Sequence, residues 1–249
     1  MTAARRRALV TVLILMVAGA LLATSCHQRS AAPRGKPELL LLTSLPLVFG
    51  DDFNLRNQGS PALAALSQRF RVRPISTSRR EELATGRLLL MAQPPAQTPD
   101  NLVALDGWVR NGGRILLIVD PMLEWPSPHP LGDPLRPPIM FTDTGLLAHW
   151  GLRLDAPDRR GPVGRTLHGR QIIAWSPGSL TGGCSIGPQG FVADCRIGKG
   201  RAIVVADADL LNVPASAPEL KAVTDLLAWL SSNDSLRTDL STGAPARTT

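Results

Sequence analysis

Residues 111–121, Asn-Gly-Gly-Arg-Ile-Leu-Leu-Ile-Val-Asp-Pro, decide the fold class of this chain, and residues 198–207, Gly-Lys-Gly-Arg-Ala-Ile-Val-Val-Ala-Asp, have the same pattern. Each stretch is a Gly-rich turn, an Arg, an apolar run of strand length and an Asp. Such a run is typical of a parallel strand that is buried on both faces. Asp120 and Asp207 are therefore expected at the carboxyl ends of parallel strands, where open α/β sheets bind their ligands.

Strand and helix patterns alternate along the rest of the chain. This alternation predicts an α/β fold of three layers, with a doubly wound, mostly parallel sheet and right-handed crossovers. Two further strands, at 171–175 and 191–197, lie between Gly and Pro turns and predict a small antiparallel β insertion. The main-sheet strands are expected at 38–42, 71–75, 87–91, 114–119 and 201–206, and the helices at 61–70, 98–110, 141–150 and 218–230. Ser78, followed by Glu81, predicts a capping box for one more short helix.

The N-terminus has the three-part layout of a bacterial secretory signal. Arg5, Arg6 and Arg7 precede an apolar segment at 8–23, which is followed by Thr-Ser-Cys ending at Cys26. The chain is therefore expected in the cell envelope, in the periplasm or on the periplasmic face of the inner membrane. Three outcomes stay open: cleavage before Cys26, lipidation of Cys26, or retention of the segment as a membrane anchor.

The domain boundaries follow from composition. Residues 1–26 form the signal or anchor, 27–37 a linker, 38–232 one α/β domain, and 233–249 a flexible tail rich in Ser, Thr, Asp and Arg. The formal charge is +7, of which the N-terminal Arg triplet supplies three. The other Arg residues are scattered among acids without aromatic residues for base stacking, so we expect no nucleic acid partner.

Cys184 and Cys195 are the only thiols of the expected mature domain, and an oxidising periplasm favours a disulfide between them. The alternative is a catalytic Cys184 on the strand-turn-helix elbow of class I glutamine amidotransferases. That elbow needs Gly two places on either side of the Cys and a buried strand before it. Gly182 fits, but Ile186 does not, and residues 179–181 do not resemble a buried strand. We expect the disulfide and assign no catalytic residue.

Polar side chains that follow predicted strands form a candidate ligand site. Asp120, Asp207 and Asp209 carry the hard oxygen ligands that suit a small cation, and the whole edge suits a small polar ligand. Alternatively, each Asp caps the turn or helix that follows it. No spacing matches a known metal loop, so capping is expected and neither a metal nor a cofactor is assigned. The candidate residues are Ser44, Gln93, Asp120, Asp207, Asp209 and Asn212.

The order of these motifs resembles a known family. After residues 112–121 come Leu-Leu-Ala-His-Trp-Gly-Leu at 146–152, Gly-Lys-Gly-Arg at 198–201, and Asp-Ala-Asp-Leu-Leu-Asn at 207–212. Over roughly 38–232 the chain is similar to the periplasmic domain of ABC-type uncharacterised transport proteins, which include gliding-motility auxiliary components. The resemblance implies a flavodoxin-like, class I glutamine amidotransferase-like fold without its Cys-His pair.

The function implied by the resemblance is that of a non-catalytic envelope binding or scaffold domain, with an ABC transporter permease or ATPase as partner and the membrane reached through the N-terminal segment. A second function stays open. The strand-edge carboxylates would then serve a periplasmic hydrolase, or a protein that binds a metal or a polar ligand.

Overall fold

The computed structural model describes residues 35–48 and 59–232. The expected signal or anchor, the lipidation candidate Cys26, most of the linker and the tail at 233–249 lie outside the described residues. Within the described ranges, no helix combines the length and the apolar character that crossing a membrane requires.

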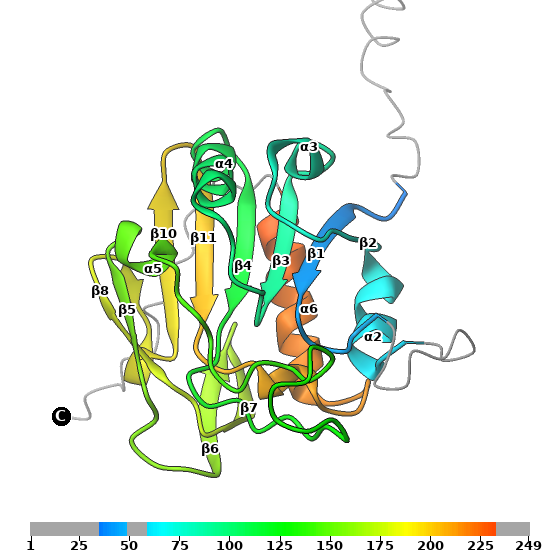
Figure 1. Cartoon of the computed structure of the whole chain (residues 1–249), viewed down its shortest axis with the longest axis vertical. Helices are drawn as coiled ribbons and strands as arrows, with labels where there is room; N and C mark the ends of the chain where they lie inside the picture. The colour runs from blue at the N-terminus through cyan, green and yellow to red at the C-terminus, as the bar shows by residue number, and fades with distance from the viewer. Residues whose placement is uncertain (1–34, 49–58, 233–249) are drawn as a thin grey trace, which may run out of the picture. The chain divides into compact units, whose positions relative to one another are not determined.

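A seven-stranded sheet forms the centre of the fold, in the order β2-β1-β3-β4-β11-β10-β9 (Figure 1). The first five strands in this order are parallel, and β10 and β9 are antiparallel additions at one side. This confirms the α/β class and the mostly parallel sheet. The strands are β1 Glu38–Thr43, β2 Arg71–Pro74, β3 Leu88–Ala92, β4 Arg114–Ile118, β9 Ser185–Ile186, β10 Val192–Ile197 and β11 Gly200–Val205.

The central strands are buried on both faces, as their unbroken apolar runs predict. Every residue of β3 is buried, and only the first residue of β4 is partly exposed. Because side chains alternate along a strand, neighbours such as Leu116 and Leu117 enter two different cores. Two hydrophobic cores therefore hold the fold together, one on each side of the sheet.

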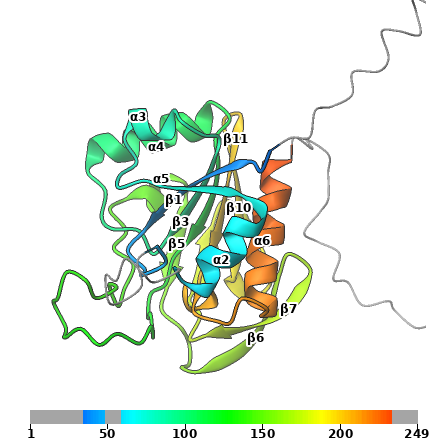
Figure 2. The same cartoon turned by 90° about the vertical axis from the view of Figure 1, so that its right-hand side faces the viewer.

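Helices cover both faces of the sheet (Figure 2). Side chains of α2 (Pro61–Arg69) and α6 (Pro218–Ser231) lie in one core, and those of α3 (Arg80–Leu83), α4 (Pro99–Arg110) and α5 (Leu146–His149) lie in the other. Two of the helices that begin at a Pro, α2 and α4, have a side-chain cap on the residue before it. Ser60 accepts a hydrogen bond from Leu63 N, and Thr98 accepts one from Asn101 N.

Two sequence predictions about helices were wrong. Ser78 does not cap α3, because the helix begins two residues later and Ser78 is buried, with its hydroxyl donating to the Asn101 carbonyl. The helix predicted at 141–150 is only Leu146–His149. Phe141 instead donates its N–H to the Asp120 carbonyl, which holds the chain extended, and Asp143 accepts from Gly145 N and Leu147 N at the helix start.

The antiparallel portion is larger than the sequence predicts. It contains two separate two-stranded antiparallel sheets, one of β5 (Leu152–Asp155) with β8 (Ser179–Gly182), and one of β6 (Pro162–Leu167) with β7 (Arg170–Trp175). Residues 179–181, which do not resemble a buried strand in sequence, belong to β8, where Leu180 is the one buried residue. Two short 3-10 helices complete the fold, η1 (Pro188–Gly190) and η2 (Asp209–Leu211).

Candidate functional site

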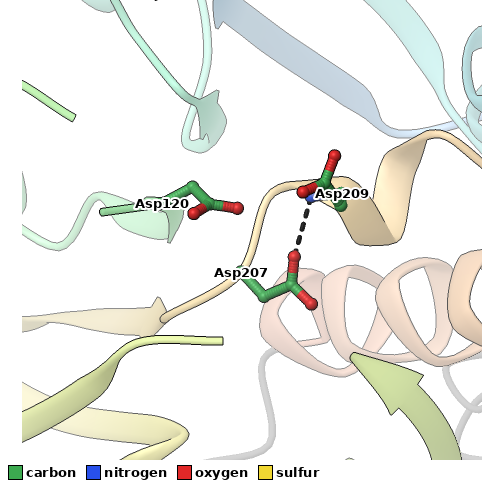
Figure 3. Close-up of side chains that lie close together, drawn as sticks. All are labelled: Asp120, Asp207 and Asp209. Atoms are coloured by element: carbon green, nitrogen blue, oxygen red, sulfur yellow. Dashed lines mark hydrogen bonds between the residues drawn. The ribbon is translucent and has the colours of Figure 1, made fainter. Parts of the chain in front are cut away.

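Three buried carboxylates meet where the central strands end. Asp120 follows β4 and Asp207 follows β11, and these strands are parallel neighbours with Ile118 opposite Val205. Asp209 begins η2, two residues further on. One oxygen from each of the three carboxylates lies within 4.8 Å of those of the other two (Figure 3). The side chains of Asp120 and Asp207 are fully buried, and Asp209 is nearly so.

Backbone N–H groups hold each carboxylate in place. Asp120 accepts from Met122 N at 2.8 Å and from Ala208 N at 2.9 Å. Asp207 accepts from Trp175 N at 2.7 Å and from Asp209 N at 2.8 Å. Both oxygens of these two carboxylates are thus engaged. The arrangement is that of caps for the segments that follow the strands, which is the structural role considered from the sequence.

A hydrogen bond to Asp209 connects a distant loop to the same cluster. Its Oδ2 accepts from Glu124 N at 2.9 Å, although the two residues lie 85 positions apart. The long Pro-rich segment that follows Asp120 is therefore fixed at its start by Asp209, in addition to the turn bond that Met122 makes with Asp120.

The three carboxyl groups titrate abnormally. Burial raises the pKa of Asp120, against the opposing effect of the Ala208 N–H. The pKa of Asp207 is raised well above its ordinary value by burial and by the negative charge of Asp120. Burial, opposed by the Glu124 N–H, raises the pKa of Asp209 to about 7. Because like charges this close disfavour joint ionisation, the cluster holds at least one proton in the neutral range.

Gln93 follows β3 and belongs to the same edge, as the sequence predicts. Its Oε1 accepts from Asp120 N at 2.9 Å, and its Nε2 donates to the carbonyls of Asp120 and Pro138, both at 3.2 Å. The backbone of Gln93 has φ 41°, a left-handed conformation that costs energy in a non-Gly residue. These bonds stabilise that conformation, so the amide joins β3, β4 and the Pro-rich segment.

The other two candidates do not join the cluster. Ser44 follows β1, and its N–H donates to the Gln93 carbonyl at 3.2 Å. Asn212 is exposed at the end of η2, where its backbone N–H bonds the Asp209 carbonyl. The structure therefore brings Asp120, Asp207, Asp209 and Gln93 together, and leaves Ser44 and Asn212 at its margin.

Two residues of the network were not expected from the sequence. Glu124 accepts from the Trp175 indole Nε1 and from the Ser176 hydroxyl, both at 2.6 Å. Ser176 is fully buried, and its Oγ also accepts from Gly161 N. The Trp175 and Ser176 hydrogen bonds lower the pKa of Glu124, which keeps it ionised. No sequence signal marks either residue, because both depend on a β6–β7 hairpin whose first strand was not predicted.

Cys184 and Cys195 form a disulfide, with their Cα atoms 4.9 Å apart. It links the start of the β9–β10 hairpin, as the sequence interpretation expects, and removes Cys184 as a free thiolate nucleophile. Two His of the described residues pair with Asp. His149 Nε2 lies 3.3 Å from Asp106, and His129 Nδ1 lies 3.7 Å from Asp133.

Of the described residues, Asp120, Asp207 and Asp209 form the group that could hold a metal ion. Their carboxylate oxygens suit a hard cation such as Mg²⁺ or Ca²⁺. A cation would have to share these oxygens with the backbone N–H groups that they accept from. The same oxygens, with their shared proton, could instead bind the hydroxyl or amine of a small polar molecule.

Comparison with known proteins identifies a fold. No protein-family model matches the chain, and no curated protein matches it. The solved structure titled "mmIFT52 N-terminal domain" is 14% identical, with a TM-score of 0.52, over 80% of this chain and 99% of that one. This likeness supports the fold alone, because the identity is low.

Two other solved structures are similar to this chain with TM-scores just below 0.5. The GH42 β-galactosidase Gan42B from G. stearothermophilus is 13% identical, with a TM-score of 0.49, over 79% of this chain and 30% of that one. A cytoplasmic protein from Salmonella typhimurium LT2 is 11% identical, with a TM-score of 0.49, over 78% and 99%.

Proposed function

We propose that this chain is a non-catalytic binding or scaffold domain of the cell envelope, associated with an ABC-type transport system. The proposal includes the fold type, which is the three-layer, flavodoxin-like type of class I glutamine amidotransferases. The N-terminal segment attaches the domain to the membrane, and a permease or an ATPase is its partner.

One observation carries the non-catalytic part of the proposal. The carboxylates at the strand edge, where a hydrolase would place its base, are engaged by backbone N–H groups of the protein itself. A general base needs an oxygen within hydrogen-bond reach of the proton that it abstracts. Asp120 and Asp207 each use both oxygens to accept from backbone N–H groups of the protein, so they act as internal caps.

The disulfide supports an envelope location. Disulfides persist in oxidising compartments such as the bacterial periplasm and are rare in the cytosol. The Cys184–Cys195 bond therefore agrees with export through the N-terminal segment. The family resemblance supplies the transport association.

A pull-down from the native host tests this function. The tagged full chain would be extracted from membranes, and its partners identified by mass spectrometry, beside an Asp120→Asn/Asp207→Asn variant and an Arg153→Gln control on the exposed part of β5. Recovery of a permease and an ATPase by all three proteins supports a scaffold whose carboxylates are structural. Recovery of neither by the wild-type protein overturns the transport association.

A cation-binding function is the second candidate, favoured by the three carboxylate oxygens within 4.8 Å and the raised pKa of each carboxyl group. A bound cation would replace the proton that the cluster holds. At about pH 8, titration with Ca²⁺, Mg²⁺ or Mn²⁺ should then raise the melting temperature of the wild-type protein, and Asp209→Asn should weaken this effect. Equal melting temperatures with and without each ion would dismiss this candidate.

A further inference from the structure

The β6–β7 hairpin has one open edge. Ile173 and Trp175 donate their backbone N–H groups away from β6, to side chains elsewhere in the domain. Backbone groups alternate in direction along a strand, so Ile172 and Ala174 pair with β6. Gly164, which lies opposite Ile173, therefore points its N–H and C=O away from β7. The same alternation directs the N–H of Thr166 outward.

Carboxylates close the opposite edge, which belongs to β7. Glu219, at the start of α6, accepts from Ile173 N at 2.9 Å, and Asp207 accepts from Trp175 N at 2.7 Å. Figure 2 shows β7 on the side of the hairpin toward α6, with β6 outermost. Among the described residues, no strand other than β7 pairs with β6. The hairpin thus has one edge fixed to the domain and one edge free.

Positive charge lies along the free edge. Arg165 Nη1 donates to the outward carbonyl of Gly164 at 3.1 Å, which places the guanidinium at this edge. Arg165 Nε is buried without a hydrogen-bond partner among the described residues. Burial, and then the nearby charge of Arg159, lower the pKa of Arg165, against the opposing negative charges of Asp158 and Asp207. Arg159 itself is exposed, and it takes part in none of the ion pairs found between described residues.

The outer face of the hairpin suits a neighbouring strand. Its cross-strand pairs are Pro162 with Trp175, Gly164 with Ile173 and Thr166 with Gln171, and none of these residues is charged. Ile173 is 54% exposed and Trp175 is 42% exposed. A strand laid beside β6 would direct alternate side chains to this uncharged face and the others toward the Arg side.

We propose that the outer edge of β6 binds an extended, acidic peptide segment of a partner protein as a third strand of the hairpin. The outward N–H groups of Gly164 and Thr166 donate to the peptide backbone, and the guanidinium groups of Arg165 and Arg159 bind its carboxylates. A second copy of this chain is the poorer occupant, because antiparallel pairing of β6 with itself would bring two Arg165 side chains together. The inference goes beyond the transport role and does not depend on it.

Fluorescence anisotropy with short peptides tests this surface. The probe is fluorescein-labelled Thr-Val-Glu-Val-Glu-Val-Thr, and the control peptide replaces both Glu with Lys. The full chain should bind the acidic peptide, with an affinity that falls as salt rises, and should bind the Lys peptide at least about tenfold more weakly.

Two matched variants separate backbone pairing from charge. Gly164→Pro removes the outward N–H, whereas Gly164→Ala keeps it and places a Cβ where no atom lies within 4 Å. The Pro variant should bind the acidic peptide about tenfold or more weakly, and the Ala variant within about twofold of wild type. Arg165→Gln should also weaken binding and reduce its salt dependence, while Arg153→Gln on β5 should not.

The proposal is overturned if the acidic peptide binds no better than the Lys peptide. It is also overturned if Gly164→Pro, with a melting temperature near that of wild type, binds the acidic peptide as tightly as wild type does. If Gly164→Pro fails to fold, Arg165→Gln decides: wild-type affinity and salt dependence in that variant would exclude the charged edge as the binding surface.

Discussion

Burial of the Asp209 carboxyl group makes the stability of the folded protein depend on pH. Its pKa is raised from 3.8 to about 7 in the folded protein, so the folded state keeps a proton that the unfolded chain loses. The protonated Asp209 therefore makes its full contribution to the free energy of unfolding below about pH 4. This contribution falls as the pH rises and is lost above about pH 7, a change on the order of 2–4 kcal/mol.

Asp209→Asn should remove this pH dependence while keeping an oxygen to accept from Glu124 N. Urea unfolding of both proteins at about pH 4, 5.5 and 7 measures this pH dependence. The quantity compared is the difference in unfolding free energy between wild type and variant at each pH. Carboxyl groups with lowered pKa, such as Asp225, act in both proteins and cancel in the difference. A difference that stays constant across this range would contradict the prediction.

The residues of the candidate site could be predicted only in part. Asp120, Asp207 and Gln93 were found because each follows an apolar run, and parallel strands end at one edge. Their role as acceptors for backbone N–H groups follows from where the next segments go, which the strand pattern does not specify. Glu124 is absent from the prediction because it lies in a segment without periodicity, and its partners come from a hairpin that was only half predicted.

At the scale of elements, Gly200 permits β11 to pass close to the end of α4. A Cβ at this position would lie 2.0 Å from the Val109 carbonyl oxygen and 2.3 Å from that of Gly113. Backbone atoms cannot move aside cheaply, so Gly200→Ala should destabilise the protein by more than about 2 kcal/mol. Gly107 lies within α4 with nothing near its Cβ position, so Gly107→Ala should stabilise by about 0.5–1 kcal/mol.

Unfolding in guanidinium chloride would measure both Gly variants against wild type. Opposite signs for the two substitutions are expected, and a neutral Gly200→Ala would show that β11 and α4 approach each other less closely than described.

The elements of the main sheet were predicted well, and those of the antiparallel part poorly. Apart from β2, the parallel strands contain continuous apolar runs, so local sequence defines them. In β6, Pro162, Gly164 and Arg165 lack strand propensity, and the strand forms because β7 pairs with it along its whole length. Tertiary contacts thus decide those elements that the local pattern does not.

At the scale of the whole molecule, the Cys184–Cys195 disulfide should contribute about 3 kcal/mol by restricting the unfolded chain across a separation of 11 residues. Reduction, or the double substitution Cys184→Ser/Cys195→Ser, should lower the denaturant midpoint accordingly. The double variant should then be insensitive to reductant. Equal midpoints for the oxidised and reduced wild-type protein would mean that the bond adds nothing to stability.

The carboxylate cluster also joins segments that are distant in the chain. Trp175 N, Glu124 N and Ala208 N come from a hairpin, a Pro-rich segment and a 3-10 helix, and all three donate to Asp side chains that lie together. Deuterium exchange of these amides is expected to give one common free energy of opening, because breaking any one contact exposes the buried carboxyl groups that hold the other two. The three segments around the carboxylate cluster should accordingly open as a single cooperative unit, and they should open more often as the pH rises.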